Sequence, residues 1–141
     1  MMDEFVDDGL CFVCGKKNRR GLRIDFHLVP GEGGGAAWAE VVFPVHGQGW
    51  RGVAHGGVLA AALDEAMVKA VQSRGKACVT GEITVRFLKP VATERPYRLE
   101  GRIVEDKGKM ILAESVLLDG ASNPVARAAG KLFKVAGKAS T

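Results

Sequence analysis

Two adjacent acidic residues, Asp64 and Glu65, lie within a stretch that is otherwise almost wholly apolar. The stretch spans residues 52–67 and reads GVAHGGVLAAALDEAM. Removing a carboxylate from water costs free energy unless the group is paired, hydrogen-bonded or protonated. A carboxylate with restricted solvation has a raised pKa and is suited to act as a general base. One of these acids is therefore a candidate for catalysis, and the other needs a different explanation.

Helical periodicity separates the two acids, because successive residues of a helix are turned by about 100°. Glu65 shares a stripe with Lys69 and Gln72, so we expect it on a polar face that is solvated or at the edge of an interface. Glu65 and Lys69 also form a favourable pair one turn apart. Asp64 falls on an apolar stripe with Gly57, Ala61, Val68 and Val71. Asp64 is thus the candidate base, and the alternative is a structural ion pair with an arginine of a neighbouring strand.

Two glycines, Gly56 and Gly57, follow His55 at the expected start of this helix. The first N–H groups of a helix lack intrahelical partners and carry the positive end of the helix dipole. A glycine there lets a ligand approach the backbone closely, and its N–H group can stabilise a developing oxyanion. The same glycines would equally serve close contact between the helix and a sheet, so both interpretations stay open.

The chain has three cysteines, which are Cys11, Cys14 and Cys78. Their odd number argues against a disulfide framework. The spacing Cys11-x-x-Cys14 is that of half a zinc site, but a structural zinc takes four ligands. Cys78 and His27 are the other candidates by type, and no spacing links them to the pair. We therefore expect no metal and treat Cys11 and Cys14 as small buried residues that anchor an N-terminal arm, residues 1–19.

One long helix and several strands are predicted to position these residues. The helix covers residues 55–74, where alanine dominates, no proline intervenes and Gly75 marks a natural end. Apolar and polar residues alternate as in strands over 21–29, 36–44, 77–90, 97–105, 110–119 and 125–135. Residues 31–35, GEGGG, are predicted to turn between the first two strands.

These elements predict an α+β fold, in which a curved antiparallel β-sheet of about six strands wraps around one long central α-helix. The last strands are joined by short turns and should pair antiparallel. The predicted helix is so apolar that the sheet must cover it nearly all round, and its alanines let the sheet approach closely. In the strand after the helix, alternation puts Val79, Ile83, Val85 and Phe87 on one side and Arg86 on the other.

The composition is that of an ordinary globular domain. The chain has 141 residues, 47% of them hydrophobic and 26% charged, so a single domain over 1–141 is expected. Its formal charge of +4 mildly favours anionic partners, but aromatic residues are only 6% and no basic block is interleaved with them. We expect no nucleic-acid partner, no membrane association and a cytoplasmic location, because no segment resembles a membrane span or a secretory signal.

Three motifs resemble those of hotdog-fold acyl-CoA thioesterases of the phenylacetate-degradation type. HGGVLAAALDEAM is similar to the helix signature of that family, CFVCGKKNRRGLRIDF to its opening segment, and TGEITVRFLKPV to its strand after the helix. The resemblance covers residues 11–135. It implies a hotdog fold, hydrolysis of an acyl-CoA to a free acid and CoA without a further cofactor, and homodimers that continue the sheet and can pair into homotetramers.

The resemblance also implies roles for individual residues. Asp64 matches the family's base or nucleophile, and Gly56 matches the glycine whose N–H group forms the oxyanion hole. His55 would line the thioester pocket, and Thr80 would help to hold the attacking water. Some members carry Asn or Gln about six residues before the histidine; that position is glycine here, so its neighbour Gln48 is the residue carried over.

Substrate binding would involve Gly57 beside the thioester and, for the CoA phosphates, Arg86 and Lys89. A solvated strand face is the alternative explanation for the last two. Two other functions compete with hydrolysis. One is a hotdog dehydratase, against which GWRGVAHGG lacks the proline that such loops carry. The other is a non-catalytic acyl-CoA-binding protein, against which no second domain is apparent.

The spacing of Gly56 and Asp64 predicts a site shared by two chains. Eight residues along a straight helix correspond to about 12 Å, whereas an oxyanion donor and a general base must both lie within hydrogen-bonding reach of one reaction centre. Two antiparallel helices related by a two-fold axis would bring the start of one beside the middle of the other. An obligate homodimer with two equivalent sites is therefore expected.

Overall fold

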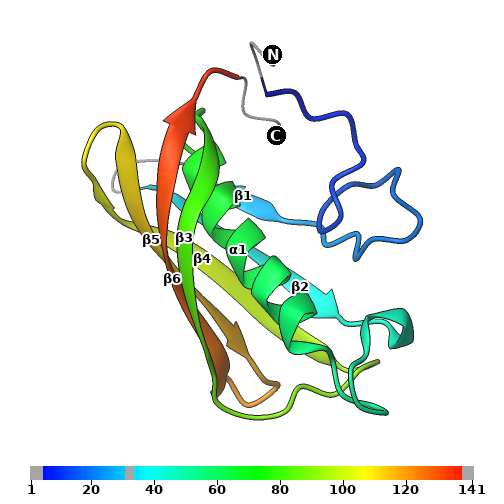
Figure 1. Cartoon of the computed structure of the whole chain (residues 1–141). Helices are drawn as coiled ribbons and strands as arrows, with labels where there is room; N and C mark the ends of the chain where they lie inside the picture. Colours follow the sequence, from blue (N-terminus) through cyan, green and yellow to red (C-terminus); the bar gives the residue numbers. More distant parts are fainter. Residues whose placement is uncertain (1–4, 31–33, 138–141) are drawn as a thin grey trace.

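A computed structural model of the chain describes residues 5–30 and 34–137, which form one antiparallel sheet and one long helix (Figure 1). The sheet has the order β1-β2-β4-β5-β6-β3. The elements are β1 (His27–Val29), β2 (Ala36–Val42), the short 3-10 helix η1 (Val45–Gly47), α1 (Gly56–Gln72), β3 (Ala77–Phe87), β4 (Pro96–Asp106), β5 (Met110–Leu118) and β6 (Pro124–Val135). In the described residues, no helix is long and apolar enough to cross a membrane.

The predicted architecture is confirmed, since the curved sheet wraps around α1, as Figure 1 shows. The predicted hairpins β1–β2, β4–β5 and β5–β6 all form. The strand after the helix, β3, pairs with β6 and not with its neighbour in sequence. Residues 88–95 carry the chain across the end of the sheet, where Lys89 N–H donates to the Val125 carbonyl and Glu94 N–H donates to the Phe43 carbonyl. β4 therefore starts beside β2.

The first predicted strand, residues 21–29, was too long, because only His27–Val29 pair with the sheet. Arg23 has a φ of 52°, which breaks the extended conformation. The N–H groups of Leu22 and Ile24 donate instead to the carbonyls of Phe12 and Val13, each at 2.8 Å. Residues 22–26 thus hold the N-terminal segment rather than extend the sheet. The predicted turn at 31–35 lies mostly outside the described residues.

The helix α1 begins and ends close to the prediction of 55–74. His55 is its N-cap, and Gly75, with a φ of 75°, follows its C-terminal turn. The sheet approaches the helix closely: a Cβ on Gly101 of β4 would collide with the carbonyl of Ala66. The core is closed by large side chains from the helix, the strands and their connections, chiefly Phe43, Leu63, Met67, Leu99, Ile111, Leu117 and Leu132.

Candidate active site

Asp64 lies in the middle of α1 and meets Thr80 of β3. The Thr80 hydroxyl donates a hydrogen bond of 2.5 Å to Asp64 Oδ1, and both side chains are half-buried. Burial raises the pKa of Asp64 above its ordinary value, while the Thr80 hydroxyl opposes this and the nearby Cys11 adds to it. Among the described residues, Asp64 forms no ion pair with an arginine. Asp64 therefore has the restricted solvation and the fixed orientation that a general base needs.

A β-bulge turns Thr80 toward the helix. The pairing of β3 with β6 shifts between Thr80 and Glu82, so Gly81 is the extra residue. Cys78 on one side of the bulge and Ile83 and Val85 beyond it all pack toward the core. Simple alternation had placed Val79 with Ile83 and Val85, and this was wrong, because an extra residue reverses the direction of every side chain that precedes it.

A glycine is required at the bulge by close packing. A Cβ on Gly81 would collide with the ring of Phe133 on β6. The glycine therefore permits the extra residue, and the extra residue permits Thr80 to face Asp64.

The start of α1 presents one backbone donor that has no partner in the described structure. The Gly57 N–H donates to His55 Nδ1 at 2.8 Å, so His55 caps the helix with its side chain. This bond occupies the Gly57 N–H group. The Gly56 N–H group has no hydrogen-bond acceptor among the described residues, and a Cβ on Gly56 would lie 3.5 Å from the ring of Phe87. Of the two predicted glycines, Gly56 keeps the available donor.

Within one chain, the Gly56 N–H group and the Asp64 carboxylate do not meet. Gly56 is the first residue of α1, and Asp64 lies eight residues further along the same helix. That separation corresponds to about 12 Å along the helix axis. Asp64 and Thr80 are therefore brought together by the fold, while His55 and Gly56 stay at the end of the helix.

Gln48 is used within its own loop. Its Oε1 accepts a hydrogen bond of 3.2 Å from Gly52 N–H, and Gln48 forms a backbone bridge with Ala54. The neighbouring Gly49 lies against His55, since a Cβ added to it would be 3.5 Å from His55 Cδ2. Gln48 thus holds the loop that leads into the helix.

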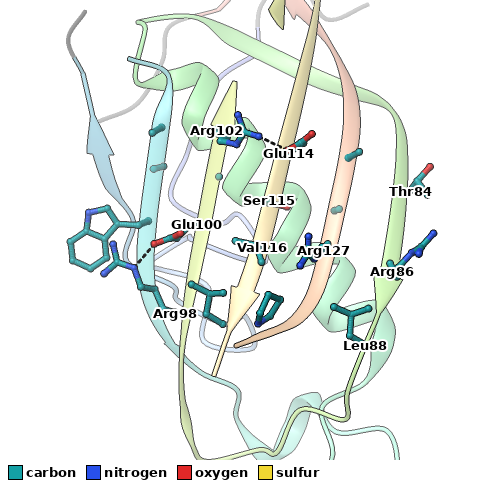
Figure 2. Close-up of a pocket in the computed structure, with 18 of the residues that line it drawn as sticks. Thr84, Arg86, Leu88, Arg98, Glu100, Arg102, Glu114, Ser115, Val116 and Arg127 are labelled. Atoms are coloured by element: carbon teal, nitrogen blue, oxygen red, sulfur yellow. Dashed lines mark hydrogen bonds and ion pairs between the residues drawn. The ribbon is translucent and has the colours of Figure 1, made fainter. Parts of the chain in front are cut away.

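Arg86 lies on the outer face of the sheet, as the strand pattern predicted, and Lys89 is exposed in the connection that follows β3. Figure 2 shows Arg86 with Thr84 and Arg127 over a hollow of the sheet, with the helix behind the strands. The sheet therefore separates Arg86 from the Asp64 of its own chain.

The prediction for Glu65 was wrong, because the N-terminal segment covers this side chain. Cys11 Sγ lies 3.5 Å from Glu65 Oε2, and Cys14 Sγ lies 3.8 Å from Glu65 Oε1. Lys69, which was expected on the same polar face, is buried. The surroundings of Glu65 are set by Cys14 and Cys11, which lie 51 and 54 positions away in the sequence. Helical periodicity carries no information about such distant contacts.

The long strand β3 forms one edge of the sheet, with β6 as its only strand neighbour. Its backbone has no strand partner on the other side within the described chain. Phe87 and Leu88, at the end of this edge, are 52% and 44% exposed. An edge of this length with apolar side chains is a surface to which another chain can add.

Residues 51–120 match the family model described as the thioesterase superfamily. They include the helix, Asp64, Thr80 and the edge strand. This segment is similar to the thioesterase superfamily. A candidate esterase of Saccharolobus solfataricus is 36% identical over 81 residues, which are 56% of this chain and 53% of that protein. The match thus spans about half the length of that curated relative.

Several solved structures share the fold. The E. coli PaaI protein of the phenylacetic acid degradation operon has a TM-score of 0.74 at 21% identity, covering 83% of both chains. A Streptococcus mutans protein bound to acetyl CoA has a TM-score of 0.73 at 19% identity, covering 80% of this chain and 89% of its own. A hypothetical thioesterase of Streptococcus pneumoniae with coenzyme A has a TM-score of 0.73 at 18% identity, covering 80% of this chain and 89% of its own. The hotdog fold expected from the sequence is therefore confirmed.

Proposed function

We propose that this chain hydrolyses the thioester of an acyl- or aryl-CoA, with Asp64 as the general base. The hydrogen bond from Thr80 to the half-buried Asp64 carries this proposal. It fixes one carboxylate oxygen and leaves the other free to accept a proton from water. Water activated in this way attacks the thioester carbonyl, the oxyanion collapses, and the CoA thiolate leaves. No cofactor is needed beyond the substrate.

Two features of related structures support the assignment. The Streptococcus pneumoniae protein was solved with alanine in place of an aspartate and, separately, of a threonine sixteen residues further along its chain. Asp64 and Thr80 are also sixteen residues apart. Coenzyme A or acetyl CoA is present in two of the similar structures, and this favours a CoA thioester as the substrate here.

The oxyanion donor in this proposal is the Gly56 N–H group of a second chain. Gly56 has the donor that His55 leaves available, and its own Asp64 is out of reach. A homodimer formed by antiparallel pairing of two β3 edges would set the two α1 helices antiparallel. The start of each helix would then approach the middle of the other, and each dimer would have two equivalent sites. Pairing of two dimers into a tetramer is compatible with this site.

Arg86 and Lys89 are proposed to contact the phosphates of CoA. Arginine suits this role because its planar guanidinium binds phosphate oxygens in pairs. Arg86 is turned away from its own Asp64, so it would have to serve a site that includes another chain. A cytoplasmic location agrees with the three cysteines, which are all free thiols.

The test is release of free CoA thiol by the purified chain from a graded series of straight-chain and aryl-CoA thioesters. We expect turnover of at least one class, and loss of turnover with retained binding in Asp64→Asn. Binding of acyl-CoA without any thiol release would favour the non-catalytic binding protein. Hydration of an enoyl-CoA without thiol release would favour the dehydratase.

A further inference from the structure

A second cluster of reactive side chains lies under the N-terminal segment, outside the proposed site. Cys11 and Cys14 face Glu65, and one ligand atom from each of the three residues lies within 4.8 Å of the others. Cys78 and His27 were further candidate ligands by residue type alone, and the structure places Glu65 beside the two cysteines instead. Among the described residues, Cys11, Cys14 and Glu65 are the one set of three Cys, His, Asp or Glu side chains whose ligand atoms converge in this way.

The separations in this cluster fit a tetrahedral zinc ion. Zinc binds thiolate sulfur at about 2.3 Å and carboxylate oxygen at about 2.0–2.2 Å, which places the two ligand atoms about 3.5 Å apart. The Cys11 sulfur lies 3.5 Å from one carboxylate oxygen of Glu65, and the Cys14 sulfur lies 3.8 Å from the other. Both separations are close to that between two ligands of one zinc ion, and one ligand atom from each residue lies within 4.8 Å of the others.

The Cys11–Cys14 turn is closely packed. The Gly15 N–H donates to the Cys11 carbonyl at 2.9 Å, and a Cβ on Gly15 would lie 2.5 Å from Cys11 N, so only glycine closes this turn. Zinc binds the thiolate form of cysteine, so metal binding would release the thiol protons.

The charges around the cluster balance with a divalent cation. Two thiolates and one carboxylate carry three negative charges. The buried Lys69 lines the same pocket as the three residues. A dication together with Lys69 would neutralise the fully deprotonated set.

The fourth coordination position would face a cavity. The three residues line a pocket of about 430 Å³ together with Lys69 and Gln72. Gln72 Oε1 is buried and has no hydrogen-bond partner among the described residues. A metal-bound water in this pocket would complete the tetrahedron and could donate to Gln72.

We propose that Cys11, Cys14 and Glu65 bind a structural Zn²⁺ ion that fastens the N-terminal segment to α1. Thiolate ligands select zinc over the hard cations magnesium and calcium. This proposal departs from the expectation of no metal, which rested on the lack of a four-ligand set in the sequence; here three side chains converge and a water would be the fourth ligand. The ion is separate from the hydrolytic step and acts on the stability of the arm.

The test measures zinc directly in the full chain, expressed with zinc, purified under reductant and without chelator. We expect about one zinc per chain, as for a single structural site. Cobalt substitution should give the charge-transfer and visible bands of tetrahedral thiolate coordination. Chelation should lower the thermal midpoint of the wild-type chain. Glu65→Gln should weaken zinc binding at least about tenfold, since losses outside the coordination sphere already cost that much.

Cys78→Ser is the matched control, because Cys78 lines the same pocket without being a proposed ligand. It should keep its zinc, whereas Cys11→Ser and Cys14→Ser should lose it. A reduced, folded wild-type chain that takes up no zinc above the buffer level and shows no cobalt–thiolate spectrum would overturn the proposal. Zinc retained by a folded variant that carries both Cys11→Ser and Cys14→Ser, or zinc lost from Cys78→Ser, would also overturn it.

Discussion

At the scale of single residues, Asp64 and Glu65 are neighbours with opposite surroundings. Asp64 accepts a hydrogen bond from a hydroxyl group at the edge of the sheet, whereas Glu65 faces two thiols under the N-terminal segment. Burial raises the pKa of both carboxyl groups. Only Asp64 lies beside the strand edge that another chain can reach, so only Asp64 is assigned to hydrolysis.

Asp64→Asn should lower kcat by about 10²–10⁴, the usual contribution of a general base. The amide keeps the size of the side chain and cannot accept the proton. Glu65→Gln is the matched variant and should keep most of the activity in folded protein at saturating zinc. Rates of thiol release from the best acyl-CoA decide the question. A larger loss in Glu65→Gln, with its circular dichroism unchanged, would reverse the assignment.

Thr80→Val should lower kcat about tenfold or more, because a hydrogen bond to a charged group contributes about 1.5–3 kcal/mol. Valine preserves the shape of the side chain but cannot orient the carboxylate. Thr80→Ser keeps the hydroxyl and should retain most of the activity. If valine and serine reduce kcat equally, then packing and not the hydrogen bond explains the role of Thr80.

The sequence was sufficient to single out Asp64, because the apolar stripe around it follows from helix geometry alone. It was not sufficient for Glu65. Its neighbours Cys11 and Cys14 are 54 and 51 residues away, and their approach depends on how the first residues fold back over the helix.

At the scale of elements, the helix was predicted to within a few residues and the strands unevenly. Alanine content and the flanking glycine define α1 locally. The pairing of β3 with β6 depends on the eight-residue crossing from 88 to 95, for which no local rule exists. The bulge at Gly81 was also missed, since a single inserted residue leaves a strand pattern that still looks regular on either side.

Gly101→Ala should destabilise the fold by about 2–3 kcal/mol, the upper part of the range for overpacking. The added methyl group would meet the carbonyl of Ala66, and neither the strand nor the helix backbone can move aside easily. Gly120→Ala is the control, because nothing lies within 4 Å of its Cβ position, and it should change stability by less than about 0.5 kcal/mol. Urea unfolding midpoints test both. Equal stability of the two variants would mean that the helix and the sheet can separate slightly without cost.

At the scale of the whole molecule, the site proposed here is incomplete in one chain. In the proposed dimer, Asp64 and Thr80 would come from one protomer and the Gly56 donor from its partner. The sequence predicts this sharing from helix rise alone, because the distance between the two groups on one helix exceeds the reach of one reaction centre.

Mixing an Asp64→Ala protein with a Gly56→Pro protein should restore activity. Gly56→Pro removes the N–H donor but suits the first position of a helix, where proline is tolerated. His55 already has an extended backbone, with a φ of −62° and a ψ of 136°, as a residue before proline requires. Each variant alone should be nearly inactive, and each heterodimer would have one intact site. With random exchange at equal amounts, half of the dimers are mixed, so about a quarter of the wild-type sites should return.

Two controls accompany this experiment. Subunit exchange is monitored independently, by mass differences between labelled chains. Two copies of the same variant mixed together should stay inactive. If exchange is complete and activity does not return, the donor and the base belong to one chain or the donor is not Gly56.

The two edges of the sheet differ greatly in length, and this difference limits how far assembly can proceed. β3 offers eleven residues at one edge, whereas β1 offers three at the other. If two chains join through their β3 strands, each outer edge of the joined sheet consists of β1 and the residues of β2 that β1 does not cover. This edge changes from one strand to another along its length, so it gives an incoming chain no single long strand to bind. We therefore expect assembly along the sheet to stop at the pair.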